Sequence, residues 1–189
     1  MRKIFLIELN GPAETGKDTF VKYFKEIGLA NNCIIRNFHK SDKPKELLKC
    51  LGWNREKNQD ARTVLAGMTE VYTKSEKCIQ DFKTVCYELL LNPAANHFNA
   101  VLFFQSRDKE TGRLNQAIKD IEILIDDPVK YVSVYLYRNG VENTEINYWS
   151  AEMGEYDVIL KLENGIENTK KAAENFFYRL FGGDENDNE

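Results

Sequence analysis

Nine residues near the N-terminus have the types and spacing of a loop that binds phosphate. They match the pattern G-x-x-x-x-G-K and run Gly11-Pro12-Ala13-Glu14-Thr15-Gly16-Lys17-Asp18-Thr19. In such a loop the backbone N–H groups point at phosphate oxygens, the following helix adds a positive dipole, and the lysine adds a full charge. We therefore expect residues 11–19 to bind the phosphates of a nucleotide. The alternative is an ordinary glycine-rich turn between a strand and a helix, which can match the same sequence pattern by chance.

The residue after the lysine departs from the common pattern and bears on metal binding. Most such loops carry Ser or Thr there, and its hydroxyl ligates Mg²⁺, whereas this chain has Asp18. A second acid usually stands at the end of a neighbouring strand, but here that position holds Gln105, and Asp108 lies further on. Because a carboxylate can itself bind Mg²⁺, directly or through water, we predict Asp18 as the metal-binding residue.

Transfer of a phosphoryl group needs cations and positioning more than it needs covalent help from the protein. Ligands bind at the carboxyl ends of parallel strands, and an arginine there can hold a phosphate with two N–H groups. We predict catalytic roles for Lys17, Arg107 and Arg138, and acceptor binding by Arg36, Arg62 and Arg107. The plain alternative for each arginine is a solvated side chain that leaves the sheet.

Two further titratable residues have two interpretations each. Glu8 lies within an apolar run, so it either reaches the site or is a paired structural carboxylate. His39 follows the second apolar run and fits a polar residue at the sheet edge better than a catalytic base.

The elements that must position these residues alternate along the chain. Strand-like runs cover 3–10, 33–38, 100–106, 131–137 and 157–162, and helix-like stretches cover 17–28, 44–51, 59–91, 114–124 and 166–181. Alternation of this kind predicts parallel strands joined by right-handed crossovers, with helices on both faces of the sheet. We therefore predict a three-layer α/β/α fold with a five-stranded, mainly parallel sheet.

The stretch 59–91 is too long for a tight crossover. Gly67 weakens or breaks it near its first third, and Asn92-Pro93 ends it. The stretch is either an inserted helical pair on the acceptor side of the phosphate loop or a longer crossover that only packs on the sheet.

Composition indicates a soluble, single-domain protein that binds a small ligand. The chain has 189 residues, of which 42% are hydrophobic and 30% are charged, and no apolar run approaches the roughly 20 residues of a membrane span. The formal charge of −4 resides in the last eight residues, which hold four acids and no base, so the body is near neutral and does not suggest long nucleic acid as a partner. The aromatic content of 12% leaves room for a homodimer face.

The cysteines bear on the compartment. Cys33, Cys50, Cys78 and Cys86 are scattered and form no C-x-x-C pair. They are typical of the buried thiols of a cytoplasmic protein rather than of disulfides or a zinc site.

Short motifs in this chain resemble those of the deoxynucleoside monophosphate kinases, which are P-loop enzymes. Residues 16–19 resemble the G-K-D-T loop of that family, in which an aspartate after the lysine is usual. Residues 62–70 resemble a degraded form of its R-x-x-L-Q-x-L-G-T-E segment that is one residue shorter, with Ala66 in place of the glutamine.

The remaining matches are shorter. Residues 105–107 stand where the family has D-V-R, so Arg107 is kept and Gln105 replaces the acid. Arg138 corresponds to an arginine after the next strand, and the segments S-A-E at 150–152 and N-G at 164–165 resemble two further short runs of the family.

This resemblance implies a P-loop NTPase fold and a kinase-like domain over residues 1–181, with 59–91 as the acceptor-side insertion. The composition of 182–189 predicts a disordered acidic tail. It implies ATP as co-substrate, held with Mg²⁺ by Lys17 and the loop amides, and a (deoxy)nucleoside monophosphate or similar small phosphorylated metabolite as acceptor. Arg62 and Arg107 would contact the acceptor phosphate, and Arg138 would be a lid-side cation. Because Gln105 stands where an acid is expected, the second hypothesis is a nucleotide-binding or sensing protein with weak catalysis.

Overall fold

One parallel sheet organises the fold. A computed structural model describes residues 2–12, 14–54, 58–95, 97–105, 111–141 and 156–182. Its strands pair in the order β2-β3-β1-β4-β5, and every pair is parallel. All five predicted strands are present with bounds within two residues of the expectation: β1 (Ile4–Asn10), β2 (Cys33–His39), β3 (Asn99–Gln105), β4 (Val129–Arg138) and β5 (Val158–Leu162).

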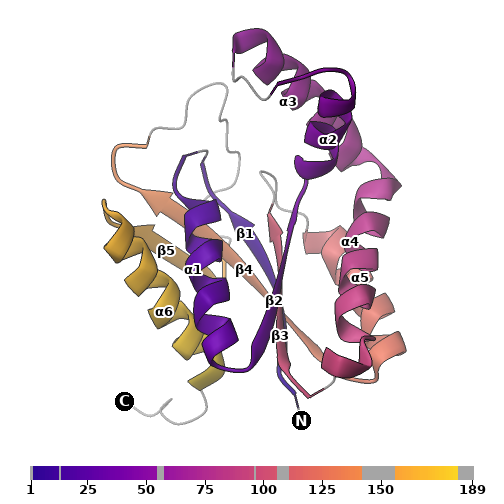
Figure 1. The fold of residues 1–189 in the computed structure, drawn as a ribbon. Coiled ribbons are helices and arrows are strands. Elements are labelled where there is room, and N and C mark those ends of the chain that lie inside the picture. The colour runs from indigo at the N-terminus through magenta and orange to yellow at the C-terminus, as the bar shows by residue number, and fades with distance from the viewer. Residues whose placement is uncertain are drawn as a thin grey trace.

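Helices cover both faces of the sheet, as predicted. α1 and α6 lie on one face, and α4 and α5 lie on the other (Figure 1). α2 and α3 stand beyond the carboxyl ends of the strands, at the same end of the molecule as the phosphate loop (Figure 1). The helices are α1 (Lys17–Ala30), α2 (Asp42–Cys50), α3 (Gln59–Lys74), α4 (Glu76–Leu90), α5 (Thr111–Ile125) and α6 (Ile166–Gly182), with a short 3-10 turn at Pro93–Ala95.

Alternate residues of the central strand feed two separate cores. Phe5, Ile7 and Leu9 pack with the phenylalanines of α1 and α6, whereas Ile4 and Leu6 pack with apolar side chains of α4 and α5. The strand is buried along its whole length because both faces are covered, which accounts for its almost continuous apolar sequence. A strand of this kind can carry a polar residue only where that residue finds partners.

The stretch 59–91 divides at a different place from the one predicted. α3 continues through Gly67 and ends at Lys74, and the break falls at Ser75, which has extended backbone angles. Gly67 meets no atom of the described residues near its Cα, so its only cost is the modest helix penalty of glycine, about 1 kcal/mol. The Ser75 hydroxyl instead donates to the Tyr72 carbonyl at 2.6 Å and fixes the turn.

The two halves of this stretch have different surroundings. α4 buries Cys78, Ile79, Phe82, Cys86, Leu89 and Leu90 against the sheet and is therefore a packed crossover helix. None of the residues of α3, all of which are described, is buried. α3 is fastened at its C-terminal end, where Arg113 of α5 donates to the carbonyls of Thr73 at 2.6 Å and Ser75 at 2.7 Å.

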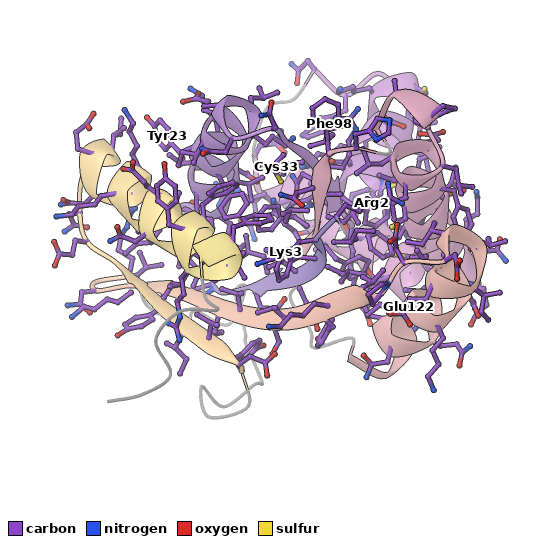
Figure 2. All side chains as sticks on the ribbon, turned by 90° about the horizontal axis from the view of Figure 1, so that it is seen from below. Arg2, Lys3, Tyr23, Cys33, Phe98 and Glu122 are labelled. Atoms are coloured by element: carbon purple, nitrogen blue, oxygen red, sulfur yellow. The ribbon has the colours of Figure 1, made fainter. Side chains whose placement is uncertain are left out.

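The amino ends of the strands are closed by polar contacts. Figure 2 views this edge from below, with Arg2 and Lys3 at the start of β1 and Glu122 on α5. Arg2 Nε donates to Asp127 Oδ2 at 2.7 Å, and Glu122 Oε1 accepts the backbone N–H of Val129 at 2.7 Å. A hollow of about 310 Å³ beside Arg2 lies at this edge, away from the phosphate loop.

The cysteines are free thiols, as predicted, but one of them is not buried. Cys33, Cys78 and Cys86 are buried, and burial raises the pKa of the Cys33 thiol to about 12. Cys50 is exposed because it ends α2, which stands clear of the sheet. Within the described part of the chain, no helix combines the length and the apolar character that a membrane crossing requires.

Candidate functional site

The first glycine of the predicted phosphate loop is required by close backbone packing. Gly11 follows β1 directly and has φ +139°, in the region that favours glycine. A Cβ at this position would lie 2.0 Å from the carbonyl oxygen of Leu136 on β4, which is backbone and cannot turn aside. Only glycine at position 11 therefore allows the chain to leave β1 along this path.

The second glycine brings the loop against an arginine. Gly16 is the N-cap of α1 and has left-handed backbone angles. A Cβ there would lie 3.1 Å from Nη2 of Arg138, the last residue of β4. The same Nη2 donates to Oγ1 of Thr169, in the first turns of α6, at 3.1 Å. The predicted lid-side cation thus lies beside the start of the phosphate-loop helix.

Lys17 begins α1 and lies folded over the loop. Its Nζ donates to the carbonyl oxygens of Gly11 at 2.5 Å and Pro12 at 2.6 Å. The buried Thr15 hydroxyl donates to the same Pro12 carbonyl at 2.9 Å. These contacts hold a full positive charge at the mouth of the loop, where a phosphate would bind.

Asp18 and Gln105 meet between α1 and the end of β3. Gln105 Nε2 donates to Asp18 Oδ1 at 3.4 Å and to Asn37 Oδ1 of β2 at 3.0 Å. The Gln105 side chain is 1% exposed, and its Oε1 has no hydrogen-bond partner among the residues that the structure describes. The position where an acid was expected is therefore occupied by an amide in direct contact with the carboxylate on the helix.

His39 ends β2 and is placed next to the same cluster, because its strand partner is Gln105. Its Nδ1 accepts the backbone N–H of Ser41 at 3.1 Å and lies 2.7 Å from the Ser41 hydroxyl. Burial is the main cause that lowers the pKa of His39 below 6.5, so the ring is neutral at pH 7. Among the surrounding charges, Lys45 and Lys17 lower this pKa, and Asp42 and Asp18 raise it.

Lys40, a candidate cation because it follows the second strand directly, is a buried cation at the same edge. It is 4% exposed, and its Nζ lies 5.3 Å from the centroid of the Phe104 ring. A cation over an aromatic face is stabilised electrostatically when it is removed from water. Its place directly after β2 was visible in the sequence, but its burial depends on the packing of β2 beside β3.

Glu8 is a paired structural carboxylate, the second of its two interpretations. It is fully buried in β1 on the face covered by α4 and α5, and it accepts hydrogen bonds from the Tyr131 hydroxyl and from Asn10 Nδ2 at 3.4 Å. Asn10 Nδ2 also donates to the Tyr156 hydroxyl at 3.0 Å. These partners offset the cost of burying a carboxylate between two cores.

Of the other predicted arginines, the structure describes Arg36 and Arg62, and both are exposed. Arg36 is exposed in the middle of β2 opposite Leu102, three residues and about 10 Å before the register position of Gln105. Arg62 is exposed on α3. Ala13, Arg107 and the segment 150–152 lie outside the described residues, as do 183–189 of the predicted tail.

A small hollow lies at the end of β5. It has a volume of about 180 Å³ and is lined by Asn139, Lys161, Leu162, Glu163 and Asn164. Leu162 also lies 3.6 Å from the position of a Cβ on Gly16, so the hollow is adjacent to the phosphate loop. The Asn164-Gly165 turn that ends it has φ +105° at the glycine and leads directly into α6.

A solved structure shares this architecture. An APS kinase of Mycobacterium tuberculosis in complex with AMPPNP and APS superposes with a TM-score of 0.50 at 10% identity, over 96% of this chain and 99% of that chain. A thymidylate kinase of Ehrlichia chaffeensis gives a TM-score of 0.35 at 12% identity, over 93% of this chain and 87% of that one. No protein-family model matches this chain, and no curated protein matches it in sequence.

The chain has a P-loop NTPase fold. The five-stranded parallel sheet, the helices on both faces and the loop between β1 and α1 all agree with that assignment. At 10% identity the superposition establishes the fold alone, so activity must be argued from the site itself.

Proposed function

We propose that this protein binds ATP at residues 11–19 and transfers its γ-phosphoryl group to a (deoxy)nucleoside monophosphate or a similar small phosphorylated metabolite. The observation that carries the proposal is the convergence of Lys17, Asp18 and Arg138 on the start of α1, at the carboxyl edge of the sheet. Open α/β sheets bind their ligands at this edge.

The donor site follows from the loop and its neighbours. Backbone N–H groups around Gly16 and the N-terminus of α1 favour an anion, and Lys17 and Arg138 add two cations. The hollow at Asn139 and Lys161–Asn164 adjoins Gly16 and has room for part of a nucleoside, so we assign the ATP base and sugar to it. In this assignment the γ-phosphate faces Asp18 and Gln105.

The acceptor site lies on the α2 and α3 side of the same edge (Figure 1). Lys40, buried directly after β2, and Lys45 of α2 are cations of this region, and Lys45 pairs with Asp42 at 3.2 Å. A buried cation at this edge fits an acceptor that carries a phosphate. We include Arg62 and Arg107 in this site from the sequence, and we leave Arg36 out because it lies mid-strand on the sheet edge.

The transfer itself is an in-line displacement. An ionised oxygen of the acceptor phosphate forms a bond to the γ-phosphorus, the bond from that phosphorus to the β–γ bridging oxygen breaks, and ADP leaves with the electron pair. A phosphate acceptor is already ionised at pH 7, so no base is needed, and the protein contributes positioning and charge stabilisation. Lys17 and Arg138 stabilise the charge that develops on the transferred group.

Magnesium is the expected partner of ATP in this site. The residues present fit a divalent cation, because Asp18 offers a carboxylate and Gln105 offers a buried amide oxygen without a hydrogen-bond partner in the described chain. When bound with the nucleotide, the cation neutralises phosphate charge.

The test is ADP release by the purified protein with a panel of ribo- and deoxynucleoside monophosphates as acceptors. We expect ADP release that depends on the acceptor, and its loss in Lys17→Ala. Tight ATP binding by calorimetry without acceptor-dependent ADP release across the panel would instead favour a nucleotide-binding or sensing protein. That alternative is suggested by Gln105, which stands where an acid is expected. Absence of both binding and turnover would overturn both functions.

A further inference from the structure

We propose that His39 donates a hydrogen bond from Nε2 to the phosphate of the acceptor and so selects an acceptor that carries a phosphate over one that offers only a hydroxyl. This inference deepens the proposed function and rests on it. His39 is the last residue of β2, at the edge of the sheet where the phosphate loop lies. The chain has two histidines, and the other one, His97, is exposed in the turn before β3.

Ser41 fixes both the orientation and the proton of the His39 ring. Nδ1 accepts the backbone N–H of Ser41 at 3.1 Å, so this nitrogen carries no proton. The Ser41 hydroxyl lies 2.7 Å from the same nitrogen and can therefore only donate to it. An imidazole without a proton on Nδ1 is neutral and carries its proton on Nε2. Burial, which lowers the pKa of His39, favours the same neutral form.

This contact uses a hydroxyl that would otherwise be available to cap α2. Ser41 is the N-cap of α2, a position at which serine usually accepts an N–H of the first turn, but its side chain makes no such hydrogen bond. Ser41 is therefore a positioning residue for the ring. Nε2, on the opposite side of the ring, is directed away from Ser41 and has no hydrogen-bond partner among the residues that the structure describes.

The strand register places the ring beside the residues that face the proposed γ-phosphate. His39 and Asn37 are alternate residues of β2, so both lie on the sheet face that α1 covers. Asn37 accepts from Gln105 at 3.0 Å, and Gln105 is the strand partner of His39. His39 lies one step nearer than Asn37 to the carboxyl edge, where open α/β sheets bind their ligands.

Charged residues on two sides show which part of the site the ring adjoins. Lys17 and Asp18 act on it from the start of α1, where the proposed γ-phosphate lies, and Lys45 and Asp42 act on it from α2, on the proposed acceptor side. The acceptor phosphate must approach the γ-phosphorus across this space, where Nε2–H can donate to one of its oxygens. Because Nε2 already holds its proton, it cannot take one from a hydroxyl, and the ring therefore fits an acceptor that is already ionised.

The test compares two amides that each replace one side of the ring. The amide of His39→Asn reaches only as far as Nδ1, whereas the amide of His39→Gln reaches as far as Nε2 and can restore the donor. Ser41→Ala keeps the backbone N–H and removes the hydroxyl. ADP release with ribo- and deoxynucleoside monophosphates gives KM for the acceptor and, separately, KM for ATP. His97→Asn makes the same substitution at the other histidine and is the matched control.

We expect His39→Asn to raise KM for the acceptor by about 10- to 100-fold, as loss of a hydrogen bond to a charged group does, and to leave KM for ATP within about twofold. His39→Gln should have an acceptor KM at least about fivefold lower than that of His39→Asn, and Ser41→Ala should raise it by about three- to tenfold. The control should match the wild type, and melting temperatures show whether each variant is folded. The corresponding nucleosides, which offer only hydroxyls, should not support ADP release.

Four results would overturn this role: an acceptor KM unchanged in His39→Asn, a KM for ATP that rises as much as the acceptor KM, a His39→Gln variant no better than His39→Asn, or nucleosides that serve as well as their monophosphates. Failure of the proposed function has a different signature, because the wild type itself would then release no ADP in response to any monophosphate, and the role of His39 would fall with it.

Discussion

Arg138 closes directly against Gly16, with its Nη2 3.1 Å from the place where any side chain at that glycine would begin. The same nitrogen donates to Thr169, so one guanidinium joins the end of β4, the start of α1 and the start of α6. Its Nε is buried without a hydrogen-bond partner in the part of the chain that the structure describes. The arginine is therefore held in place on one side and retains donor capacity on the other.

Replacing Arg138 should weaken nucleotide binding more than it weakens the fold. We expect Arg138→Met to lower ADP affinity by about 10- to 100-fold, since hydrogen bonds to charged groups contribute about 1.5–3 kcal/mol. Arg138→Lys should recover only part of this, because an ammonium cannot reach Thr169 and a phosphate in the same planar geometry. Calorimetry measures the ADP affinity of both variants. The control is Arg179→Met, because Arg179 is exposed near the end of α6. Equal affinity in Arg138→Met and the control would refute the role.

Two glycines that look alike in the sequence should respond oppositely to alanine. Gly11→Ala forces a Cβ to within 2.0 Å of the Leu136 carbonyl, so we expect a loss of roughly 2–5 kcal/mol in the free energy of unfolding. Gly67→Ala enters open space inside α3 and should stabilise that helix by about 0.5–1 kcal/mol. Urea unfolding measures the first, and amide exchange within α3 measures the second. A tolerated alanine at Gly11 would contradict the loop geometry.

Arg113 should control the rigidity of α3 at a distance from the sheet. Arg113→Met removes the donors to the Thr73 and Ser75 carbonyls, which hold the end of α3. We expect amide exchange in α3 to become at least about tenfold faster, since these bonds come from a charged group. Exchange in β1 should stay unchanged because its core contacts are separate. The control is Lys119→Met, because Lys119 is exposed on α5 as well. Equal amide exchange of α3 in the two variants would show that Arg113 does not hold the end of α3.

His39 should make stability depend on pH in mildly acidic solution. Burial first, and then Lys45, lowers its pKa in the folded protein below the ordinary 6.5. Between these two pKa values the unfolded chain binds more protons than the folded one, so stability falls as the pH falls below 6.5 and is unaffected above it. Urea unfolding at pH 7.5 and below pH 6 should show a smaller loss in His39→Gln than in the wild type. Equal losses would mean that His39 does not contribute.

The sequence predicted the layers well because the relevant signals are local. The apolar run of β1 and the glycine pattern around Lys17 each depend on a few adjacent residues, and the structure confirms both the strand and the turn into α1. β3 is likewise covered on both faces, and its run Val101–Phe104 is apolar throughout.

The site was less predictable because it depends on which strands are neighbours. The contact between Gln105 and Asn37 exists because β2 pairs with β3, and no local pattern encodes that order. The break at Ser75 was missed because Gly67 was the visible weak point; the turn at Ser75 is held by a local hydrogen bond to Tyr72 and by Arg113 from a distant helix. Arg36 shows the same dependence: it lies opposite Leu102 in mid-strand, a place in the sheet that its position in the sequence does not show.

The folded-over position of Lys17 makes ligand binding a competition. Its ammonium already has two carbonyl oxygens within 2.6 Å, so an incoming anion must replace those contacts rather than meet a bare charge. A ligand that presents only one oxygen to this lysine gains little from the exchange, whereas a chain of phosphates can offer oxygens to the ammonium and the loop amides together. We therefore expect residues 11–19 to favour ligands with several phosphates over ligands with one.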